Sequence, residues 1–442
     1  MEVLIIGGIA AGASVAAKAK RTNPEANVTI IEKEDYVSFG ACGLPYYIGE
    51  KFTDSNQMFA RSVEKTKESG INLLLKHEVV AVDFDNKVLK IKNLEKNEQL
   101  EKRYDKLAIC TGATPIIIGE GADSENVFTV TKLYEVEKLK QYLDKSEEIV
   151  IIGSGFIGLE VADQIVGLGK KVKIIQKESY PMNKVFDKEF SELITMALEE
   201  KGVEFMVEHS YERFETENGI ATKVITDKGE FECDMAIIAI GFRPNTAFLK
   251  DTEIEMLQNG AIISDKYGKT NIEDVYALGD CASVYNPQMD NFYSPLATYA
   301  NKMGRLVGEN IVSEEQKPFI GAFGSGSLMV GDYGVAITGI SEETAKSLNL
   351  NYSSSYVIAK NHTSYYPGQS DIHVKLVYDK DTRKILGGQI FGKSGAVERL
   401  SALSVAVYKG LTVDELGFVD FAYSPPYAPT WDVLNIAGNA SK

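Results

Sequence analysis

One pattern occurs twice in this chain and strongly limits its possible folds: a short apolar strand, a glycine turn, a helix and a second apolar strand. In the first copy, residues 2–6 and 28–31 predict buried strands, with the turn Gly7-Gly8-Ile9-Ala10-Ala11-Gly12 and a helix at 13–21 between them. In the second copy, the strands are 149–152 and 171–175. Strands joined in this way lie parallel, so the sequence predicts an α/β fold with two βαβ units.

The first copy carries the fingerprint of a dinucleotide-binding unit. Its second strand ends in Glu32, 20 residues after Gly12. In this arrangement the backbone amides of the turn and the helix N-terminus face a pyrophosphate, and the carboxylate accepts a hydrogen bond from a ribose hydroxyl. Ile9 replaces the usual middle glycine. The predicted ligand-binding positions are Gly7, Gly8, Ala11, Gly12 and Glu32.

The second copy contains the complete glycine pattern, Gly153-Ser154-Gly155-Phe156-Ile157-Gly158. Its second strand ends in Gln176-Lys177 rather than in an acid. A carboxylate at this place favours NADH, and a basic residue accommodates the 2′-phosphate of NADPH. Gln176 and Lys177 therefore do not predict which of the two dinucleotides is preferred. Two units in one chain predict two dinucleotides, a bound flavin and an exchanging nicotinamide, between which hydride passes.

Cys42 is the cysteine best placed for chemistry. It lies in Val37-Ser38-Phe39-Gly40-Ala41-Cys42-Gly43-Leu44-Pro45-Tyr46-Tyr47, among glycines, a proline and aromatic residues. A reactive sulfur needs access and thiolate character, which a loop or helix start can supply. No second cysteine stands at position 37 or 47, so Cys42 has no local resolving cysteine. The alternative is a small buried apolar residue.

The remaining cysteines and the histidines do not predict a metal site. Cys110 and Cys233 lie at or near apolar strands and Cys281 follows another, which favours structural roles. None of the cysteines forms a CxxC pair, and the four histidines are scattered.

Length and charge exclude several classes of protein. At 442 residues the chain needs more than one core, and its net charge of -16 argues against non-specific binding to nucleic acid or to an anionic membrane. The apolar run 3–17 follows Glu2 rather than positive charge, and no other run approaches ~20 apolar residues. We therefore expect a cytoplasmic protein.

Two further features lie outside the duplicated units. Asp280 follows the strand 275–278 and is predicted to bind the ribityl chain of a flavin, or alternatively to cap the next helix. From about residue 323, strands at 327–330, 355–359, 373–378 and 385–391 and a helix at 396–408 predict an α+β domain with an antiparallel sheet. Tyr365 and Tyr423 lie in proline-containing loops of this domain, where packing is the commoner role.

Together these residues resemble the pyridine nucleotide–disulfide oxidoreductases, in the branch with one redox cysteine. That branch contains coenzyme A-disulfide reductases, NADH oxidases, NADH peroxidases and persulfide reductases. The resemblance implies an FAD domain at 1–113 and 244–320, an NAD(P)H domain at 114–243, a C-terminal dimerisation domain at 321–442 and a homodimer. It also implies further cofactor-binding residues: Thr111, Gly112 and Ala297 for FAD, and Gly241 for NAD(P)H.

Within the branch, the stretch 38–47 looks like the active site of coenzyme A-disulfide reductases. Tyr365 and Tyr423 match two tyrosines that those enzymes contribute from the partner subunit, although Ala41 departs from the asparagine of some members. Ala10 stands where peroxidases and water-forming oxidases of the family carry a histidine. Residues at the family's coenzyme A-binding places are Lys18, Arg21, Ser38 and Arg61.

The activity implied is reduction of coenzyme A disulfide by NAD(P)H, through FAD and a mixed disulfide between Cys42 and coenzyme A. Three alternatives remain open: an NADH oxidase working through a Cys42 sulfenic acid, a persulfide or polysulfide reductase, and a redox-sensing flavoprotein without turnover.

Overall fold

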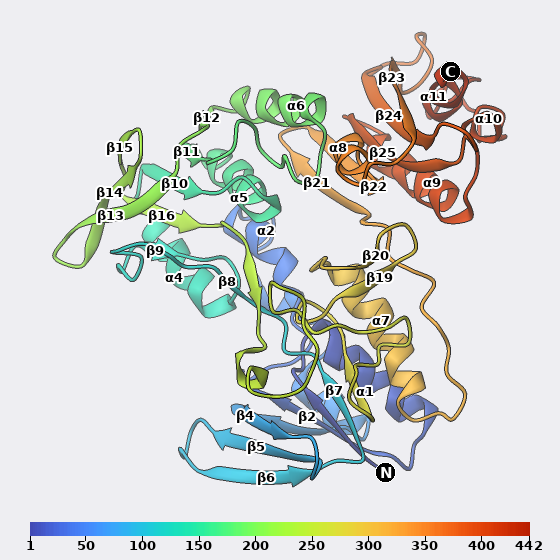
Figure 1. Ribbon diagram of the computed structural model, residues 1–442. Helices are drawn as coiled ribbons and strands as arrows, with labels where there is room; N and C mark the ends of the chain where they lie inside the picture. The colour runs from blue at the N-terminus through green and yellow to red at the C-terminus, as the bar shows by residue number, and fades with distance from the viewer. The chain divides into compact units, whose positions relative to one another are not determined.

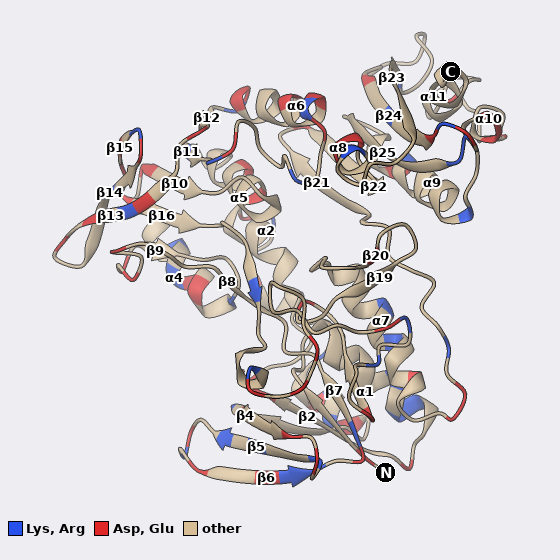
Figure 2. Ribbon diagram, viewed as in Figure 1, with Lys and Arg blue, Asp and Glu red and all other residues tan.

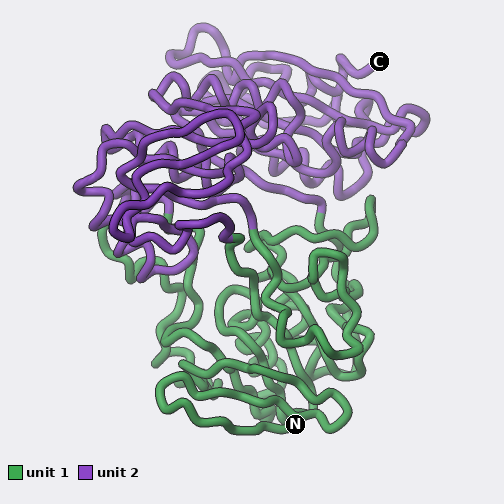
Figure 3. Tube along the Cα trace, turned by 60° about the vertical axis from the view of Figure 1, so that its left-hand side comes forward, with its two compact units in different colours: residues 1–44, 52–116, 242–322 green, residues 45–51, 117–241, 323–442 purple.

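The computed structural model describes residues 1–442 and divides into two compact units (Figure 3). Unit 1 contains residues 1–44, 52–116 and 242–322, and unit 2 contains residues 45–51, 117–241 and 323–442. Each is described by itself. The three-domain division at 113/114, 243/244 and 320/321 stays a prediction.

Unit 1 is built on a five-stranded parallel sheet with the order β18-β7-β1-β2-β3. Its strands are β1 (Glu2–Ile6), β2 (Asn27–Glu32), β3 (Asn72–Leu75), β7 (Lys106–Ile109) and β18 (Val275–Ala277). The central strands are apolar and almost wholly buried, as expected where both faces of a parallel sheet are covered.

Two helices of unit 1 pack closely together, α1 (Ala10–Thr22) and α7 (Ala297–Asn310) (Figure 1). The contact depends on glycines of α7. A Cβ atom at Gly304 would lie 2.7 Å from the carbonyl oxygen of Ala11, and one at Gly308 would lie 2.5 Å from that of Val15. The close approach places α1 and α7 over one apolar core with β1 and β2.

An antiparallel sheet of β4 (His77–Asp83), β5 (Val88–Asn93) and β6 (Gln99–Arg103) is inserted between β3 and β7. The other elements of unit 1 are short: η1 (Ala41–Gly43), η2 (Ser55–Met58), α3 (Val63–Glu68), β8 (Ala113–Pro115), β17 (Phe242–Pro244), η3 (Ala247–Leu249), β19 (Val284–Asn286) and β20 (Asp290–Phe292). Helix α2 (Leu44–Ile48) begins at the boundary of the units.

The helix-capping alternative for Asp280 is wrong. The hairpin β19–β20 lies between Asp280 and the next helix, α7, whose N-cap residue is Leu296.

Unit 2 repeats this plan between residues 117 and 241. Its parallel sheet has the order β12-β11-β10-β16-β9, and an antiparallel sheet of three strands is again inserted before the fourth strand of the βαβ layer. The elements are β9 (Val127–Phe128), α4 (Leu133–Leu143), β10 (Glu148–Ile152), α5 (Phe156–Val166), β11 (Lys171–Ile175), α6 (Lys188–Glu199), β12 (Val203–Met206), β13 (Tyr211–Glu217), β14 (Ile220–Thr226), β15 (Gly229–Glu232) and β16 (Met235–Ile238).

The C-terminal part of unit 2 is an α+β layer. Its antiparallel sheet has the order β21-β22-β25-β24-β23, and β22 was not among the predicted strands. The elements are β21 (Gly326–Val330), β22 (Tyr333–Gly339), α8 (Glu342–Ser347), β23 (Tyr352–Lys360), β24 (Asp371–Asp379), β25 (Ile385–Gly392), α9 (Ala396–Lys409), α10 (Val413–Leu416) and α11 (Val433–Ala440). Helix α9 packs on β22 and β25 over a continuous apolar core.

Charged residues of both signs are interspersed over each unit (Figure 2). None of the helices combines the length and the apolar character that crossing a membrane requires.

Candidate active site

The first glycine turn has the geometry of a dinucleotide site. Gly7 has φ +97°, and a Cβ atom there would lie 2.3 Å from the carbonyl oxygen of Cys110. A Cβ atom at Gly12 would lie 1.9 Å from the carbonyl oxygen of Gly7. The amide of Gly8 donates to Oε2 of Glu32 across 2.6 Å. Both glycines are thus required for the tight turn, and Glu32 closes onto it from the end of β2.

Asp280 lies beside this turn. A Cβ atom at the preceding Gly279 would lie 3.0 Å from the Cβ atom of Ala11, so the strand end and the start of α1 are adjacent. Burial raises the pKa of the Asp280 carboxyl above its usual range. Ala297 is the exposed first residue of α7. A partly buried carboxyl group next to the glycine turn fits a ligand that offers hydroxyl groups, as the ribityl chain of FAD does.

The strands β8 and β17, which follow Gly112 and Gly241 in the sequence, lie side by side as an antiparallel pair. Thr111 Oγ1 donates to the carbonyl oxygen of Asn245 across 2.7 Å, and Asn245 Nδ2 donates to that of Thr111 across 3.0 Å. Gly112 and Gly241 have φ values of +69° and +111°, which glycine adopts without strain. Asn245 was not predicted, because its partner lies 134 residues away.

The second glycine turn repeats the first in detail. Gly153 has φ +102°, and a Cβ atom at Gly158 would lie 2.2 Å from its carbonyl oxygen. Gly155 is the exposed N-cap residue of α5, with open space beside it. This opening suits close approach of a pyrophosphate to the backbone. At the end of β11, Gln176 is buried and Lys177 is exposed.

The segment that carries Cys42 is fixed to the first glycine turn. The amide of Ser38 donates to the carbonyl oxygen of Gly8 across 2.9 Å, and the amide of Gly40 donates to that of Met58 across 2.7 Å. Cys42 itself lies in η1 and is exposed, whereas Cys110, Cys233 and Cys281 are buried. Burial raises the pKa of the Cys233 thiol to about 12 and also raises the pKa values of the Cys110 and Cys281 thiols. Cys42 therefore has access to solvent that the other thiols lack.

The basic residues predicted to bind coenzyme A have different surroundings. Lys18 pairs with Glu309 of α7, with 2.8 Å between Nζ and Oε2. Arg21 is exposed, and its Nε donates to the carbonyl oxygen of Ala17 across 3.0 Å. Arg61 is also exposed and follows a segment whose Ala60 amide donates to the carbonyl oxygen of Ser38. Ser38 and Arg61 therefore lie on paired segments, whereas the charge of Lys18 is already balanced.

Tyr365 and Tyr423 come together although 58 residues separate them. Their hydroxyl oxygens are 3.3 Å apart, and their residues are 72% and 48% exposed. The hydrogen bond with Tyr365 raises the pKa of Tyr423. The pair therefore presents two hydroxyl groups on the surface of unit 2.

Two contacts on α2 were not predicted from the sequence. Tyr46 Oη donates to Oε1 of Glu160 on α5 across 3.1 Å. Lys140 of α4 donates from Nζ to the carbonyl oxygen of Tyr47 across 3.0 Å and lies 5.0 Å from the centre of its ring. Burial, opposed by the Tyr46 hydrogen bond, raises the pKa of Glu160. Glu160 was not predicted because nothing in the sequence of α5 distinguishes it from an ordinary charged residue of a helix.

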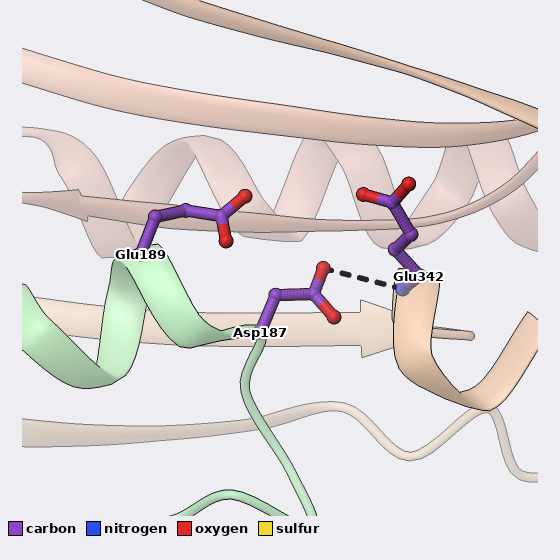
Figure 4. A group of neighbouring side chains, drawn as sticks. All are labelled: Asp187, Glu189 and Glu342. Carbon is purple, nitrogen blue, oxygen red and sulfur yellow. Dashed lines mark hydrogen bonds between the residues drawn. The ribbon is translucent and has the colours of Figure 1, made fainter. Parts of the chain in front are cut away.

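Asp187, Glu189 and Glu342 bring three carboxylates together in unit 2 (Figure 4). The ammonium group of Lys375 pairs with all three and lies 3.0 Å from Asp187 Oδ2. Burial alone would lower the pKa of Lys375, but the three carboxylates outweigh it and raise that pKa. The cluster is therefore an ion-pair network in which one ammonium group is shared by three carboxylates.

Family models match most of the chain. The model described as pyridine nucleotide-disulphide oxidoreductase matches residues 1–304, and the model of the family's dimerisation domain matches residues 326–433. The chain therefore belongs to the pyridine nucleotide-disulphide oxidoreductases, and the predicted fold is confirmed: two Rossmann-like domains, for FAD and NAD(P)H, and a C-terminal dimerisation domain.

Among its relatives is an NADH oxidase of Enterococcus faecalis, 33% identical over 100% of this chain and 99% of the relative. A coenzyme A disulfide reductase of Staphylococcus aureus is 31% identical over 100% of both chains. The solved structure of a water-forming NADH oxidase from Lactobacillus brevis, bound to NADH, is 32% identical with a TM-score of 0.96, covering 100% of this chain and 98% of that one. The protein is therefore a flavin-dependent pyridine nucleotide-disulphide oxidoreductase that uses FAD and NAD(P)H.

Proposed function

We propose that this protein is an FAD-dependent NAD(P)H:coenzyme A-disulfide reductase in which Cys42 is the redox-active cysteine. The observation that carries the proposal is the exposure of Cys42, alone among the four cysteines, on a segment hydrogen-bonded to the first glycine turn. An exposed thiol beside a flavin site can exchange with a small disulfide.

The residues around the first glycine turn would hold FAD: the turn itself, Glu32, the Thr111–Gly112 segment, Asp280 and the start of α7 at Ala297. The second turn, with Gln176, Lys177 and Gly241, would hold the nicotinamide dinucleotide. When bound, FAD supplies the two-electron link between NAD(P)H and sulfur.

Cys42 would alternate between a mixed disulfide with coenzyme A and a thiolate. Two electrons and a proton, supplied by NAD(P)H, break the mixed disulfide into the Cys42 thiolate and coenzyme A. The thiolate then attacks one sulfur of coenzyme A disulfide, which forms a new mixed disulfide and releases a coenzyme A thiolate. A ligand thiol thus replaces the resolving cysteine that the chain lacks.

Tyr365 and Tyr423 would donate a hydrogen bond or a proton to the leaving thiolate. In a homodimer, which the match to the dimerisation domain supports, these tyrosines would act on the Cys42 of the partner subunit. Ser38, Arg21 and Arg61 would contact coenzyme A, and Lys18 would do so only by giving up its pair with Glu309.

The test is anaerobic NAD(P)H oxidation by the purified flavoprotein with coenzyme A disulfide, while released thiol is counted. We expect two thiols per nicotinamide, lost in Cys42→Ser and retained in the control Cys233→Ser. Turnover with coenzyme A disulfide that survives Cys42→Ser would refute the proposal.

A second candidate function is NADH oxidation by oxygen, favoured by the similarity to NADH oxidases. Oxygen consumption that yields water and requires Cys42 would support it. Peroxide release that is independent of Cys42 would identify a side reaction of the reduced flavin. Reduction of persulfide or polysulfide would use the same Cys42 and is distinguished by comparing the substrates at equal concentration.

A further inference from the structure

Tyr365 and Tyr423 lie on two separate loops of unit 2. Tyr365 belongs to residues 361–370, between β23 and β24, and Tyr423 belongs to residues 417–432, between α10 and α11. Both residues are exposed, and a single hydrogen bond between surface hydroxyl groups holds two side chains only weakly. Their mutual position therefore depends on how the two loops are held.

Arg399, on α9, connects these two loops. Its Nη2 donates to the carbonyl oxygen of Asn361, in the first loop, across 3.1 Å, and to that of Tyr427, in the second loop, across 3.0 Å. Its other two nitrogens are also engaged. Nε donates to Oδ2 of Asp432 across 2.8 Å, and Nη1 donates to the carbonyl oxygen of Gly395 across 2.8 Å. One guanidinium group thus holds both loops.

The guanidinium group is itself fixed in place. The side chains of Arg399 and Asp432 are only 13% and 7% exposed. Asp432 is the N-cap residue of α11, where its Oδ1 accepts from the amide of Leu434 across 3.0 Å. Charged hydrogen bonds shielded from water are strong and directional. A lysine at position 399 would keep the positive charge, but it could not form this planar set of bonds.

A second connection lies closer to the tyrosines. Thr363 Oγ1 donates to the carbonyl oxygen of Pro425 across 3.1 Å. Thr363 stands two residues before Tyr365, and Pro425 stands two residues after Tyr423. The loops are therefore joined beside their tyrosines as well as at Arg399.

We propose that Arg399 and Thr363 are positioning residues that hold Tyr365 and Tyr423 together, so that the two hydroxyl groups act as one unit on the leaving sulfur. Both side chains act through the backbone of the loops and need not contact the substrate. The effect on turnover rests on the proposed function, in which the tyrosines donate to a thiolate. The placement of the tyrosine pair can be tested without it.

The first test follows the ionisation of Tyr423, replaced by 3-fluorotyrosine, with fluorine NMR across a pH titration. The hydrogen bond with Tyr365 raises the pKa of Tyr423, so Tyr365→Phe should lower the midpoint of the titration. Arg399→Lys should lower the midpoint by a similar amount, and adding Tyr365→Phe to it should then have little further effect. Thr363→Val should shift the midpoint in the same direction.

The second test separates the two halves of turnover. Arg399→Lys should lower kcat for coenzyme A disulfide by about 3- to 10-fold, because the donors are misplaced, and leave anaerobic flavin reduction by NADH unchanged. Tyr423→Phe should cost less in Arg399→Lys than in the unaltered protein, since the pair is already separated.

Arg383→Lys is the matched control. Arg383 also pairs with an aspartate of unit 2, Asp414, and its remaining hydrogen bond goes to the carbonyl oxygen of Ser441, outside both loops. This variant should leave the midpoint and kcat unchanged.

A midpoint that neither Arg399→Lys nor Thr363→Val moves would overturn the inference, as would an undiminished effect of Tyr423→Phe in Arg399→Lys. If Arg399→Lys does not fold, an unchanged midpoint in Thr363→Val alone overturns it. Failure of the unaltered protein to reduce coenzyme A disulfide would refute the proposed function instead, and the fluorine titration would still decide whether these residues position the pair.

Discussion

Tyr46 and Glu160 form a hydrogen bond that joins α2 to the helix of the second glycine turn. Tyr46 stands four residues after Cys42 in the sequence, and Glu160 stands on α5, which begins directly after Gly155. The bond is 3.1 Å long. It favours the ionised form of Glu160, but burial outweighs it and raises the pKa of that carboxyl group. The bond therefore connects α2 to a titratable residue on the helix that follows the second glycine turn.

Tyr46→Phe should move the pKa of Glu160 further upward, because the hydrogen bond that favours the ionised carboxylate is lost. Ionisation of Glu160 then requires a higher pH. The measurement is the rate of anaerobic flavin reduction by NADH between pH 5 and pH 9, followed by rapid mixing. We expect the Glu160-dependent limb of the profile to shift upward in Tyr46→Phe and to disappear in Glu160→Gln. Identical profiles in all three proteins would contradict this assignment.

Asp280→Asn should weaken FAD binding by about 10- to 100-fold, because an ionised carboxylate accepts from hydroxyl groups more strongly than an amide does. Burial raises the pKa of Asp280, so the ionised form is present above that raised pKa and is lost as the pH falls through it. Flavin absorbance retained after dialysis at stepwise lower pH reports this loss. The unaltered protein should release FAD at a pH above the usual aspartate range while its circular dichroism is unchanged, and Asp280→Asn should show no such step.

Tyr365→Phe and Tyr423→Phe should each lower kcat for coenzyme A disulfide by about 10-fold or more. Their hydroxyl groups share a hydrogen bond, so the double variant should lose less than the product of the two single effects. Tyr427→Phe is the control, since Tyr427 belongs to the same loop and is 76% exposed. A full kcat in both single variants would exclude the tyrosines from the chemistry.

Lys375→Met should destabilise the protein by about 3–5 kcal/mol, because it leaves the buried Asp187 carboxylate, beside two partly exposed ones, without its counter-charge. The pKa of Lys375 is raised in the folded protein, so its contribution is complete below the ordinary lysine pKa and is lost only as the pH rises through the higher value. Thermal unfolding at pH 7 measures the cost, and adding Glu342→Gln should recover part of it. Lys360→Met removes an exposed pair with Asp371 and should change the free energy of unfolding by less than about 1 kcal/mol. Equal effects of the two substitutions would show that the cluster stabilises the fold no more than an exposed ion pair does.

The sequence predicted those parts of the fold and site that depend on local geometry. Gly7, Gly12, Gly153 and Gly158 were identifiable because a tight turn between a strand and a helix excludes any Cβ atom at those places. The role of Asp280 in FAD binding stays a prediction, whereas its alternative role as a helix cap was wrong because the hairpin β19–β20 intervenes before α7.

Contacts between distant segments were not predictable in the same way. Tyr365 and Tyr423 were selected only through the family resemblance, since nothing local requires loops 58 residues apart to meet. The pairs Tyr46–Glu160 and Lys18–Glu309 join helices separated by more than a hundred residues, and no local pattern marks Glu160 or Glu309 as the partner.

The repeated plan of the two nucleotide units has a historical consequence. Both have the same strand order, the same glycine geometry and a three-stranded antiparallel sheet inserted at the same point (Figure 1). A shared insertion at a shared position is what duplication of one ancestral gene segment leaves behind. Glu32 and Gln176 then stand at one equivalent position of the two copies, where the first copy carries an acidic side chain and the second a neutral one.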